Sequence, residues 1–124
     1  MTDNLRLIVI IMGEKNTLLR GSKTSYRSEF SFLYVTMESR LLQKSEKQAG
    51  LVMVIVDGDK YCDGIQKTTI ELLKKHTCKP LIVFTSKFSL KLFDLALELG
   101  FDEYIAKPFH IKQLRYLLKN KKRR

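Results

Sequence analysis

Five polar residues of this chain stand within three positions of the ends of short apolar runs and could together handle a phosphoryl group. They are three carboxylates, one hydroxyl and one amine: Glu14, Asp57, Asp59, Thr85 and Lys107. Carboxylate oxygens are ligands that Mg²⁺ prefers, whereas a hydroxyl and an ammonium can hold phosphoryl oxygens. Taken singly, each residue also has an ordinary structural explanation, such as a turn aspartate or a helix cap. Their significance depends on whether the fold brings them together.

The apolar runs themselves predict five buried β-strands. Each run is short, rich in aliphatic or aromatic residues and bounded by polar ones: 5–11, 30–36, 51–56, 81–84 and 104–106. Near-continuous apolar runs of this length are typical of strands that are covered on both faces. Pro80 precedes the fourth run, a position where its missing N–H costs the strand little.

Segments with helical periodicity lie between the apolar runs. Residues 89–99 are the clearest, with leucines on one stripe and Gly100 as the expected C-terminal stop. Three further helices are expected: 37–47, 64–75 and 109–119. Segment 14–28 is expected to hold a short or irregular helix, because its periodicity is weak and Gly21 interrupts it.

This alternation of strands and helices predicts an α/β fold. The expected architecture is a doubly wound, parallel five-stranded sheet built from five βα units, with helices on both faces in three layers. Ligands of such folds bind beyond the carboxyl ends of the strands, at the point where strand order reverses. The five candidate residues stand at these ends, so the fold predicts one shared site.

Composition is that of a single globular domain. The 124 residues are 44% hydrophobic and 29% charged, which excludes the disordered class. The longest apolar runs are far shorter than the roughly 18 residues of a membrane span, so no membrane association is expected. The N-terminus lacks the basic region of a secretory signal. Cys62 and Cys78 are therefore expected to be free thiols in the cytoplasm.

The strong positive charge points to an acidic partner. The chain has 23 Lys and Arg against 13 Asp and Glu, for a formal net charge of +10, and such an excess favours polyanions, including nucleic acid. The basic residues concentrate only at the end, so we expect a domain over 1–119 and a basic tail over 120–124. A solvated, frayed helix end explains that tail better than a specific nucleic-acid contact does. Nucleic acid is expected as a partner only if the chain is fused to an output domain or assists one.

Three stretches of the sequence resemble the receiver domains of response regulators, the CheY-like superfamily with a flavodoxin-like fold. Val-Ile-Val-Asp at 54–57, with Asp-Gly at 63–64, is similar to the phosphoacceptor strand and its loop. Residues 80–86 are similar to the fourth strand with its switch hydroxyl. Residues 97–109 resemble the stretch L-x-x-G-A-x-D/E-Y-x-x-K-P-F. The resemblance covers essentially the whole chain, is strongest over 51–118 and weakens toward the N-terminus.

The resemblance implies a role for each matching residue. Asp57 would be the phosphoacceptor, Lys107 its cationic partner and Thr85 the hydroxyl that turns toward the phosphate. Tyr104 would be the aromatic switch that reports on Thr85, and a cis peptide would join Lys107 to Pro108. The chain would then be a receiver in a two-component phosphorelay and not an enzyme. Its partner would be a histidine kinase or phosphotransfer protein, and it would switch, or dimerise through, the face of the fourth and fifth strands.

The sequence departs from the family where Mg²⁺ would bind. Receivers follow the first strand with two adjacent acidic residues, whereas this chain offers only Glu14. The loop after Asp57 is one residue short and lacks the usual Met-Pro, although Asp59 offers another carboxylate. A weakened Mg²⁺ site formed by Asp57, Glu14 and Asp59 is therefore expected.

Two alternatives stay open. If neither extra carboxylate helps, a direct Asp57–Lys107 ion pair would make the chain a phosphorylation-independent pseudo-receiver, a module for protein interaction or dimerisation. The net charge and the basic tail support a third function, that of a small basic nucleic-acid-binding protein.

Overall fold

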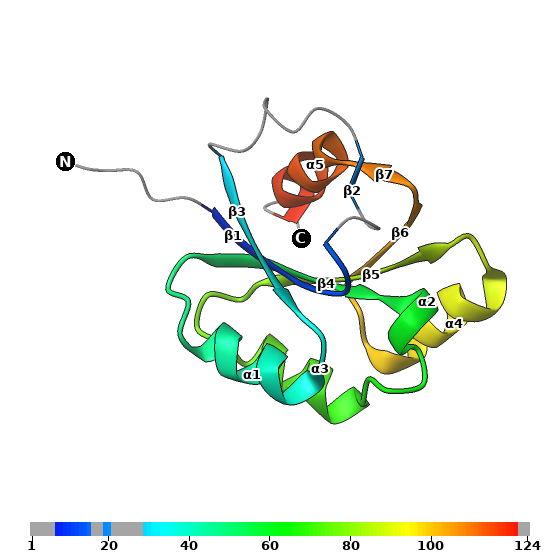
Figure 1. Ribbon diagram of the computed structural model, residues 1–124, viewed down its shortest axis with the longest axis horizontal. Coiled ribbons are helices and arrows are strands. Elements are labelled where there is room, and N and C mark those ends of the chain that lie inside the picture. The colour runs from blue at the N-terminus through cyan, green and yellow to red at the C-terminus, as the bar shows by residue number, and fades with distance from the viewer. Residues whose placement is uncertain (1–6, 16–18, 21–28, 122–124) are drawn as a thin grey trace.

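The structure of the protein is a computed structural model that describes residues 7–15, 19–20 and 29–121 (Figure 1). These residues form the following elements in chain order: β1 (Leu7–Met12), β2 (Leu19–Arg20), β3 (Phe30–Val35), α1 (Glu38–Glu46), β4 (Leu51–Asp57), α2 (Gly58–Tyr61), α3 (Lys67–Lys74), β5 (Leu81–Lys87), α4 (Leu90–Leu99), β6 (Glu103–Lys107), β7 (Phe109–His110) and α5 (Ile111–Lys121).

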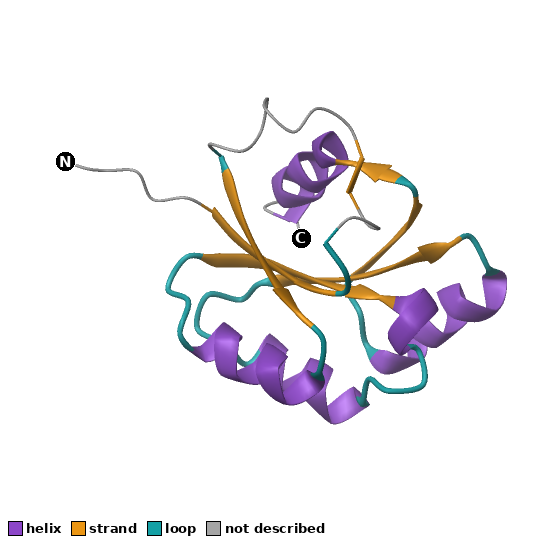
Figure 2. Ribbon diagram, viewed as in Figure 1, coloured by secondary structure: helices purple, strands orange, loops and turns teal. Residues whose placement is uncertain are grey.

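The main sheet is parallel and has five strands, as the sequence predicts, and their order is β3-β1-β4-β5-β6. The strand order reverses beside β1, because β3 lies on one side of it and β4 on the other. Figure 2 shows α1, α3 and α4 on one side of the sheet and α5 on the opposite side. The molecule therefore has three layers, and the carboxyl ends of β4, β5 and β6 form one continuous rim.

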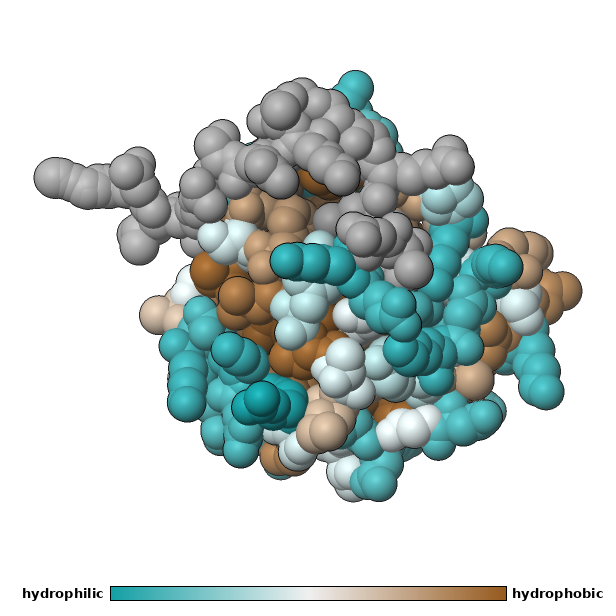
Figure 3. Space-filling view, in the orientation of Figure 1, coloured by the Kyte–Doolittle hydropathy of each residue, from teal (hydrophilic) through white to brown (hydrophobic). Residues whose placement is uncertain are grey.

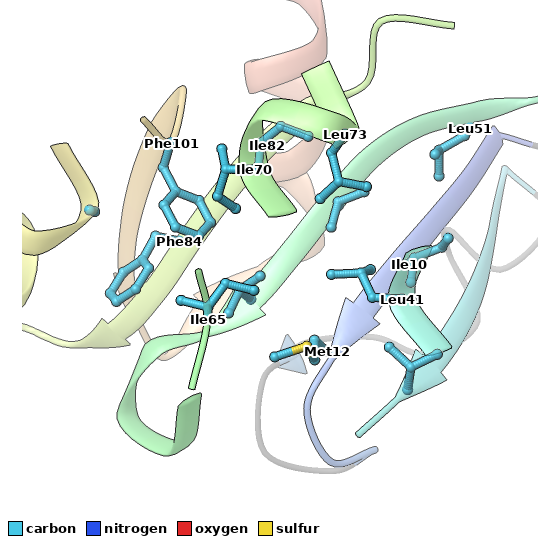
Figure 4. Close-up of a cluster of buried hydrophobic side chains, with 14 residues drawn as sticks. Ile10, Met12, Leu41, Leu51, Ile65, Ile70, Leu73, Ile82, Phe84 and Phe101 are labelled. Carbon is cyan, nitrogen blue, oxygen red and sulfur yellow. The ribbon is translucent and has the colours of Figure 1, made fainter. Parts of the chain in front are cut away.

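Two buried clusters hold the layers together, one on each face of the sheet. Strand residues alternate between them: Ile10 and Met12 belong to the cluster under α1, α3 and α4, whereas Val9 and Ile11 belong to the one under α5. Figure 4 shows the first cluster. Complete burial of one such side chain stabilises the fold by about 1.5–3 kcal/mol, so the near-continuous apolar runs are explained by their two-sided burial.

The first crossover of the sheet differs from the predicted helix over 14–28. Leu19 and Arg20 form the short strand β2, which pairs in parallel with Phe109 and His110 of β7. The rest of the crossover, 16–18 and 21–28, lies outside the described residues. The prediction was thus wrong at β2, where a weak apolar stripe gives a helix little to bury and backbone pairing with β7 takes its place.

The other predicted helices and strands are present, but some of their ends differ from the predicted bounds. Strand β5 runs on to Lys87, three residues past its expected end, so Thr85 lies inside a strand. Helix α4 is capped by the Ser89 hydroxyl, which accepts the Leu92 N–H at 3.3 Å, and it ends at Gly100, whose φ is 94°. Helix α5 extends to Lys121, two residues past the expected domain boundary. Residues 122–124 of the expected tail lie outside the described part.

Two further predictions concern membrane spans and the two cysteines. None of the helices in the described ranges combines the length and the apolar character that a membrane span requires. Cys62 and Cys78 are both free and partly buried, as predicted. The fold is therefore held by its apolar core without a disulfide between these two residues.

Candidate functional site

The centre of the candidate site is the carboxylate of Asp57. Asp57 ends β4, is only 5% exposed and caps α2, because its Oδ1 accepts the Asp59 N–H at 3.1 Å. Lys107 ends β6, two strands away, and its Nζ donates to the same oxygen at 2.7 Å. The lysine side chain thus crosses the end of β5 to reach Asp57, and the predicted meeting of these two residues is confirmed.

Asp59 completes a three-residue ion cluster. Its Oδ2 lies 3.1 Å from the Lys107 Nζ and also accepts the backbone N–H of Lys87 at 2.9 Å. One ammonium therefore bridges two carboxylates, and the described contacts to Asp57 both end on Oδ1. The contact from Lys87 fixes the loop after β4 to the end of β5, so the cluster joins three neighbouring strands.

The ion cluster keeps Lys107 charged. Burial is the largest single influence on the pKa of Lys107 and lowers it. The hydrogen bonds to Asp57 and Asp59, together with the negative charges of both carboxylates, outweigh burial and raise the pKa above its ordinary value of 10.5. A permanent positive charge therefore stands beside the Asp57 carboxylate at every physiological pH.

Thr85 lies beside Asp57 but is engaged elsewhere. The two residues are register partners in β4 and β5, as the sequence predicts. Thr85 is fully buried, and its Oγ1 donates to the Ile105 carbonyl oxygen at 2.7 Å. The hydroxyl thus stands next to the carboxylate while tying β5 to β6, and it would have to leave Ile105 before it could bind a phosphoryl oxygen.

Tyr104 contacts Ser86 rather than Thr85. Its hydroxyl lies 2.7 Å from the Ser86 Oγ. Its ring stacks on Phe84 with centroids 6.0 Å apart and meets the edge of Phe93 at 5.4 Å. Ser86 follows the fourth apolar run together with Thr85, although the resemblance assigns it no role, and side-chain alternation places it on the same sheet face as Phe84 and Tyr104.

Glu14 contacts a partner that sequence reasoning did not anticipate. Its carboxylate accepts a hydrogen bond from the Lys60 Nζ at 2.7 Å. That bond, aided by the charge of Lys60, holds the pKa of Glu14 below its ordinary value. Because both side chains are exposed, the pair contributes little to stability. The charge of Glu14 is compensated by Lys60, so Asp57 and Asp59 are the two carboxylates that share Lys107.

Comparisons with known proteins add one decisive observation. No family model and no curated protein matches the chain. Solved structures do match along nearly its whole length. A response regulator from Thermotoga maritima is 18% identical, with a TM-score of 0.60 over 96% of this chain and 97% of that one. A two-component response regulator from Clostridium difficile is 17% identical, with a TM-score of 0.63 over 96% and 98%. The chain has the receiver fold.

A third match is a receiver domain from a protein that also contains an HD domain. The signal receiver domain of an HD domain-containing protein from Pseudomonas fluorescens Pf-5 is 13% identical, with a TM-score of 0.59 over 94% of each chain. Identities this low establish the receiver fold, whereas the roles of individual residues rest on their geometry. In this receiver fold the Lys107–Pro108 peptide is cis, as the resemblance implies.

Within the described residues, two of the three expected metal ligands, Asp57 and Asp59, contact the same lysine. No group of three or more His, Cys, Asp and Glu side chains within the described ranges could hold a metal ion. Asp57 and Asp59 nevertheless converge on one cation, the Lys107 ammonium, at 2.7 and 3.1 Å. Mg²⁺ is usually held by one or two carboxylates plus phosphate oxygens and waters. The donor set of this receiver fold therefore fits an ion shared with a phosphoryl group, and it does not fit a cage of protein ligands alone.

The Thr85 hydroxyl should be important for stability. Thr85→Val keeps the side-chain shape but leaves the buried Ile105 carbonyl without its donor, which is expected to cost about 1–3 kcal/mol. Thr85→Ser retains a hydroxyl and should lose less. Urea unfolding of the two variants and the wild type measures the difference. A loss in Thr85→Val no larger than that in Thr85→Ser would contradict the assignment of the main effect to the hydrogen bond.

Proposed function

We propose that this chain is a receiver that accepts a phosphoryl group on Asp57 in a two-component phosphorelay. The observation that carries the proposal is the contact at 2.7 Å between the buried Asp57 carboxylate and the Lys107 ammonium at the strand-end rim. The donor would be a histidine kinase or phosphotransfer protein in the cytoplasm. The chain itself would serve as the phosphoryl acceptor and not as an enzyme acting on further substrates.

The proposed transfer is a displacement at phosphorus. One oxygen of Asp57 attacks the phosphorus atom, an O–P bond forms, and the bond to the donor's leaving group breaks with its electron pair. We assign Oδ2 as the attacking oxygen, because the described contacts of Asp57 occupy Oδ1. The Lys107 ammonium would neutralise charge on the phosphoryl oxygens. Mg²⁺, held by Asp57 and Asp59, would supply further neutralisation there.

The new group would be sensed through the end of β5. The Asp59 carboxylate accepts the backbone N–H of Lys87. The hydroxyl of Ser86, which precedes Lys87, is hydrogen-bonded to the Tyr104 hydroxyl. Tyr104 in turn contacts Phe93 of α4. A phosphoryl group that draws Lys107 away from Asp59 would loosen this chain of contacts, so its effect would reach α4 through Tyr104.

Helix α4 offers an apolar surface for a partner. Phe88, Leu90 and Leu97 are 70%, 69% and 61% exposed, respectively. Figure 3 shows hydrophobic side chains at the right of the molecule, where β5 ends and α4 begins. We assign these residues as the output face, which would bind a signalling partner or a second copy of the chain. Exposed apolar groups of this size commonly mark interaction sites.

A pseudo-receiver is the second candidate, and the ion cluster favours it. Lys107 bridges Asp57 and Asp59, so its ammonium could neutralise both carboxylates in place of a metal ion. In that case the cluster would hold the output face in one arrangement, and the protein would bind its partner without a phosphoryl step.

Phosphorylation of the intact chain separates the two candidates. Incubation with acetyl phosphate and Mg²⁺ is expected to add the mass of one phosphoryl group, which hydroxylamine should remove because the product is an acyl phosphate. Asp57→Asn should abolish the added mass, whereas Asp63→Asn, at an exposed aspartate of the same loop, should retain it. Asp59→Asn should raise the Mg²⁺ concentration that the reaction requires.

Two outcomes decide against phosphoryl transfer. Absence of the added mass with acetyl phosphate and phosphoramidate, on folded protein, would establish the pseudo-receiver. A phosphoryl group that survives in Asp57→Asn would place the acceptor at another residue.

A further inference from the structure

Lysines gather at the edge of the sheet opposite the candidate site. Helices of a parallel α/β fold run against the strands, so their C-terminal ends meet at the amino ends of the strands. Four described segments lie there: 44–50, 74–80, 98–102 and 117–121. Three of them, 44–50, 74–80 and 117–121, carry seven lysines, which we call the basic edge: Lys44, Lys47, Lys74, Lys75, Lys79, Lys119 and Lys121.

The three segments contact one another directly, so the basic edge is one surface. The His76 Nε2 lies 2.7 Å from the Ser45 carbonyl oxygen, and the Cys78 Sγ donates to the Ala49 carbonyl oxygen at 2.9 Å. The Lys121 Nζ donates to the carbonyl oxygen of Lys79. Figure 1 shows the chain segments that follow α1 and α3 side by side at the left end of the molecule. Lysines up to 77 positions apart in sequence (Lys44 to Lys121) thus share one edge.

The basic edge carries far more positive charge than its structural role needs. A cation in the last turn of a helix offsets the helix dipole, which accounts for Lys44, Lys74 and the two lysines of α5. Lys47, Lys75 and Lys79 lie beyond the helix ends and are exposed. Within the three lysine-bearing segments Glu46 is the single acidic residue, and the neighbouring segment 98–102 adds Glu98 and Asp102. Among the described residues, Lys74 alone of the seven forms an ion pair, with Asp102 at 3.7 Å.

The side-chain types of the basic edge indicate which class of partner it binds. The three segments contain no aromatic residue and no exposed large apolar side chain. Binding of single strands relies on bases stacking on aromatic rings, and stable membrane binding relies on buried apolar area. An array of ammonium groups alone matches the regularly spaced phosphates of a duplex. We therefore propose that the basic edge binds the phosphate backbone of double-stranded nucleic acid without reading its sequence.

Binding through the basic edge has a measurable salt dependence. Each phosphate that a lysine neutralises contributes about 0.9 to the slope of log K against log salt concentration. Removal of three lysines should therefore reduce that slope by about 2.7. The dissociation constant of the wild type should fall in the range of non-specific binders, about 10⁻⁴–10⁻⁶ M at physiological salt.

The test compares two triple variants of the full chain. Lys47→Gln, Lys75→Gln and Lys79→Gln together remove charge from the basic edge. The control carries Lys67→Gln, Lys91→Gln and Lys112→Gln, which remove the same charge from exposed positions near the starts of α3, α4 and α5. Fluorescence anisotropy with an arbitrary duplex DNA, between about 0.05 and 0.2 M salt, should show the lower slope and weaker affinity only for the edge variant.

Several outcomes would overturn the proposal. Equal losses in both triple variants would mean that net charge, and not the edge, attracts DNA. Full binding by the edge variant and none by a chain truncated after Lys121 would place the contact in residues 122–124. Tighter binding to anionic phospholipid vesicles than to duplex DNA would make the partner a membrane. Thermal unfolding must show that both variants remain folded.

The proposal is independent of the phosphoryl site. Asp57 lies at the opposite end of the strands, so Asp57→Asn should bind duplex DNA as the wild type does. Loss of DNA binding in Asp57→Asn would overturn the assignment to the basic edge. Conversely, a chain that accepts no phosphoryl group would leave the DNA result unchanged.

Discussion

Lys107→Met is expected to lower the free energy of unfolding by about 3–5 kcal/mol, because it leaves a buried carboxylate without its partner. The side chain of Asp57 is 7% exposed, and the ammonium that neutralises it comes from a side chain that is 13% exposed. Methionine preserves the length and apolar stem of lysine, so the loss reports charge more than packing. Asp59 adds a second negative charge to the uncompensated site. Urea unfolding at neutral pH measures the effect.

Three comparisons assign this loss to the ion cluster. Lys91→Met changes an exposed lysine and should alter stability by no more than about 0.5 kcal/mol. Asp57→Asn combined with Lys107→Met removes both charges and should regain much of the lost stability, since neither charge is then buried alone. The raised pKa of Lys107 means that its contribution persists below its ordinary value of 10.5 and is lost as the pH rises through the raised value. A double variant no more stable than Lys107→Met would contradict the explanation.

The site could be located from the sequence because parallel sheets obey strong rules. Apolar runs that are buried on both faces mark the strands, and the carboxyl ends of neighbouring strands must meet. Asp57 and Lys107 were therefore assigned to one site although they are separated by 50 positions. The register of β4 and β5 places Thr85 beside them. Backbone topology fixes these positions without knowledge of any side-chain rotamer.

Contacts that depend on side-chain direction could not be predicted in this way. The sequence offered Glu14 as a metal ligand, yet its partner, Lys60, lies 46 positions away on the short helix α2. Thr85 and Ser86 are adjacent hydroxyls, and only the observed geometry assigns Ser86 to Tyr104 and Thr85 to the β6 backbone. The distribution of charge along the sequence likewise indicated only the basic tail. The lysines of the basic edge are far apart in sequence and come together only after folding.

Gly58→Ala is expected to destabilise the fold by about 1–3 kcal/mol or more, because a side chain at this position would overpack the core. An ideal Cβ on Gly58 would lie 2.1 Å from the Cζ of Phe84. The Phe84 ring cannot move aside easily, since it is fully buried and packs against Phe101 and Tyr104 with centroids 5.0 and 6.0 Å away. Figure 4 shows Phe84 beside Phe101 in this cluster. Thermal and urea unfolding measure the loss.

Gly64→Ala is the matched control, at the glycine that follows α2. Its added Cβ would meet nothing closer than the Tyr61 carbonyl oxygen at 3.9 Å, an ordinary contact. It should leave stability unchanged or raise it by about 0.4–1 kcal/mol, since alanine restricts the unfolded chain. Destabilisation of Gly64→Ala as large as that of Gly58→Ala would mean that the loop, and not the Phe84 contact, requires glycine.

A double-mutant cycle connects the Gly58 contact to the phosphoryl site. Phe84→Leu removes the ring atoms that the new Cβ would meet, so Gly58→Ala should cost less in that background than in the wild type. Because Gly58 stands between Asp57 and Asp59, any shift that relieves the clash must also displace the two carboxylates that share Lys107. If Asp57 is the phosphoacceptor, as proposed, Gly58→Ala should slow its phosphorylation as well as weaken the fold, and Phe84→Leu should partly restore both. A variant that loses stability but accepts the phosphoryl group at the wild-type rate would show that the core contact at Gly58 and the geometry of the ion cluster are independent.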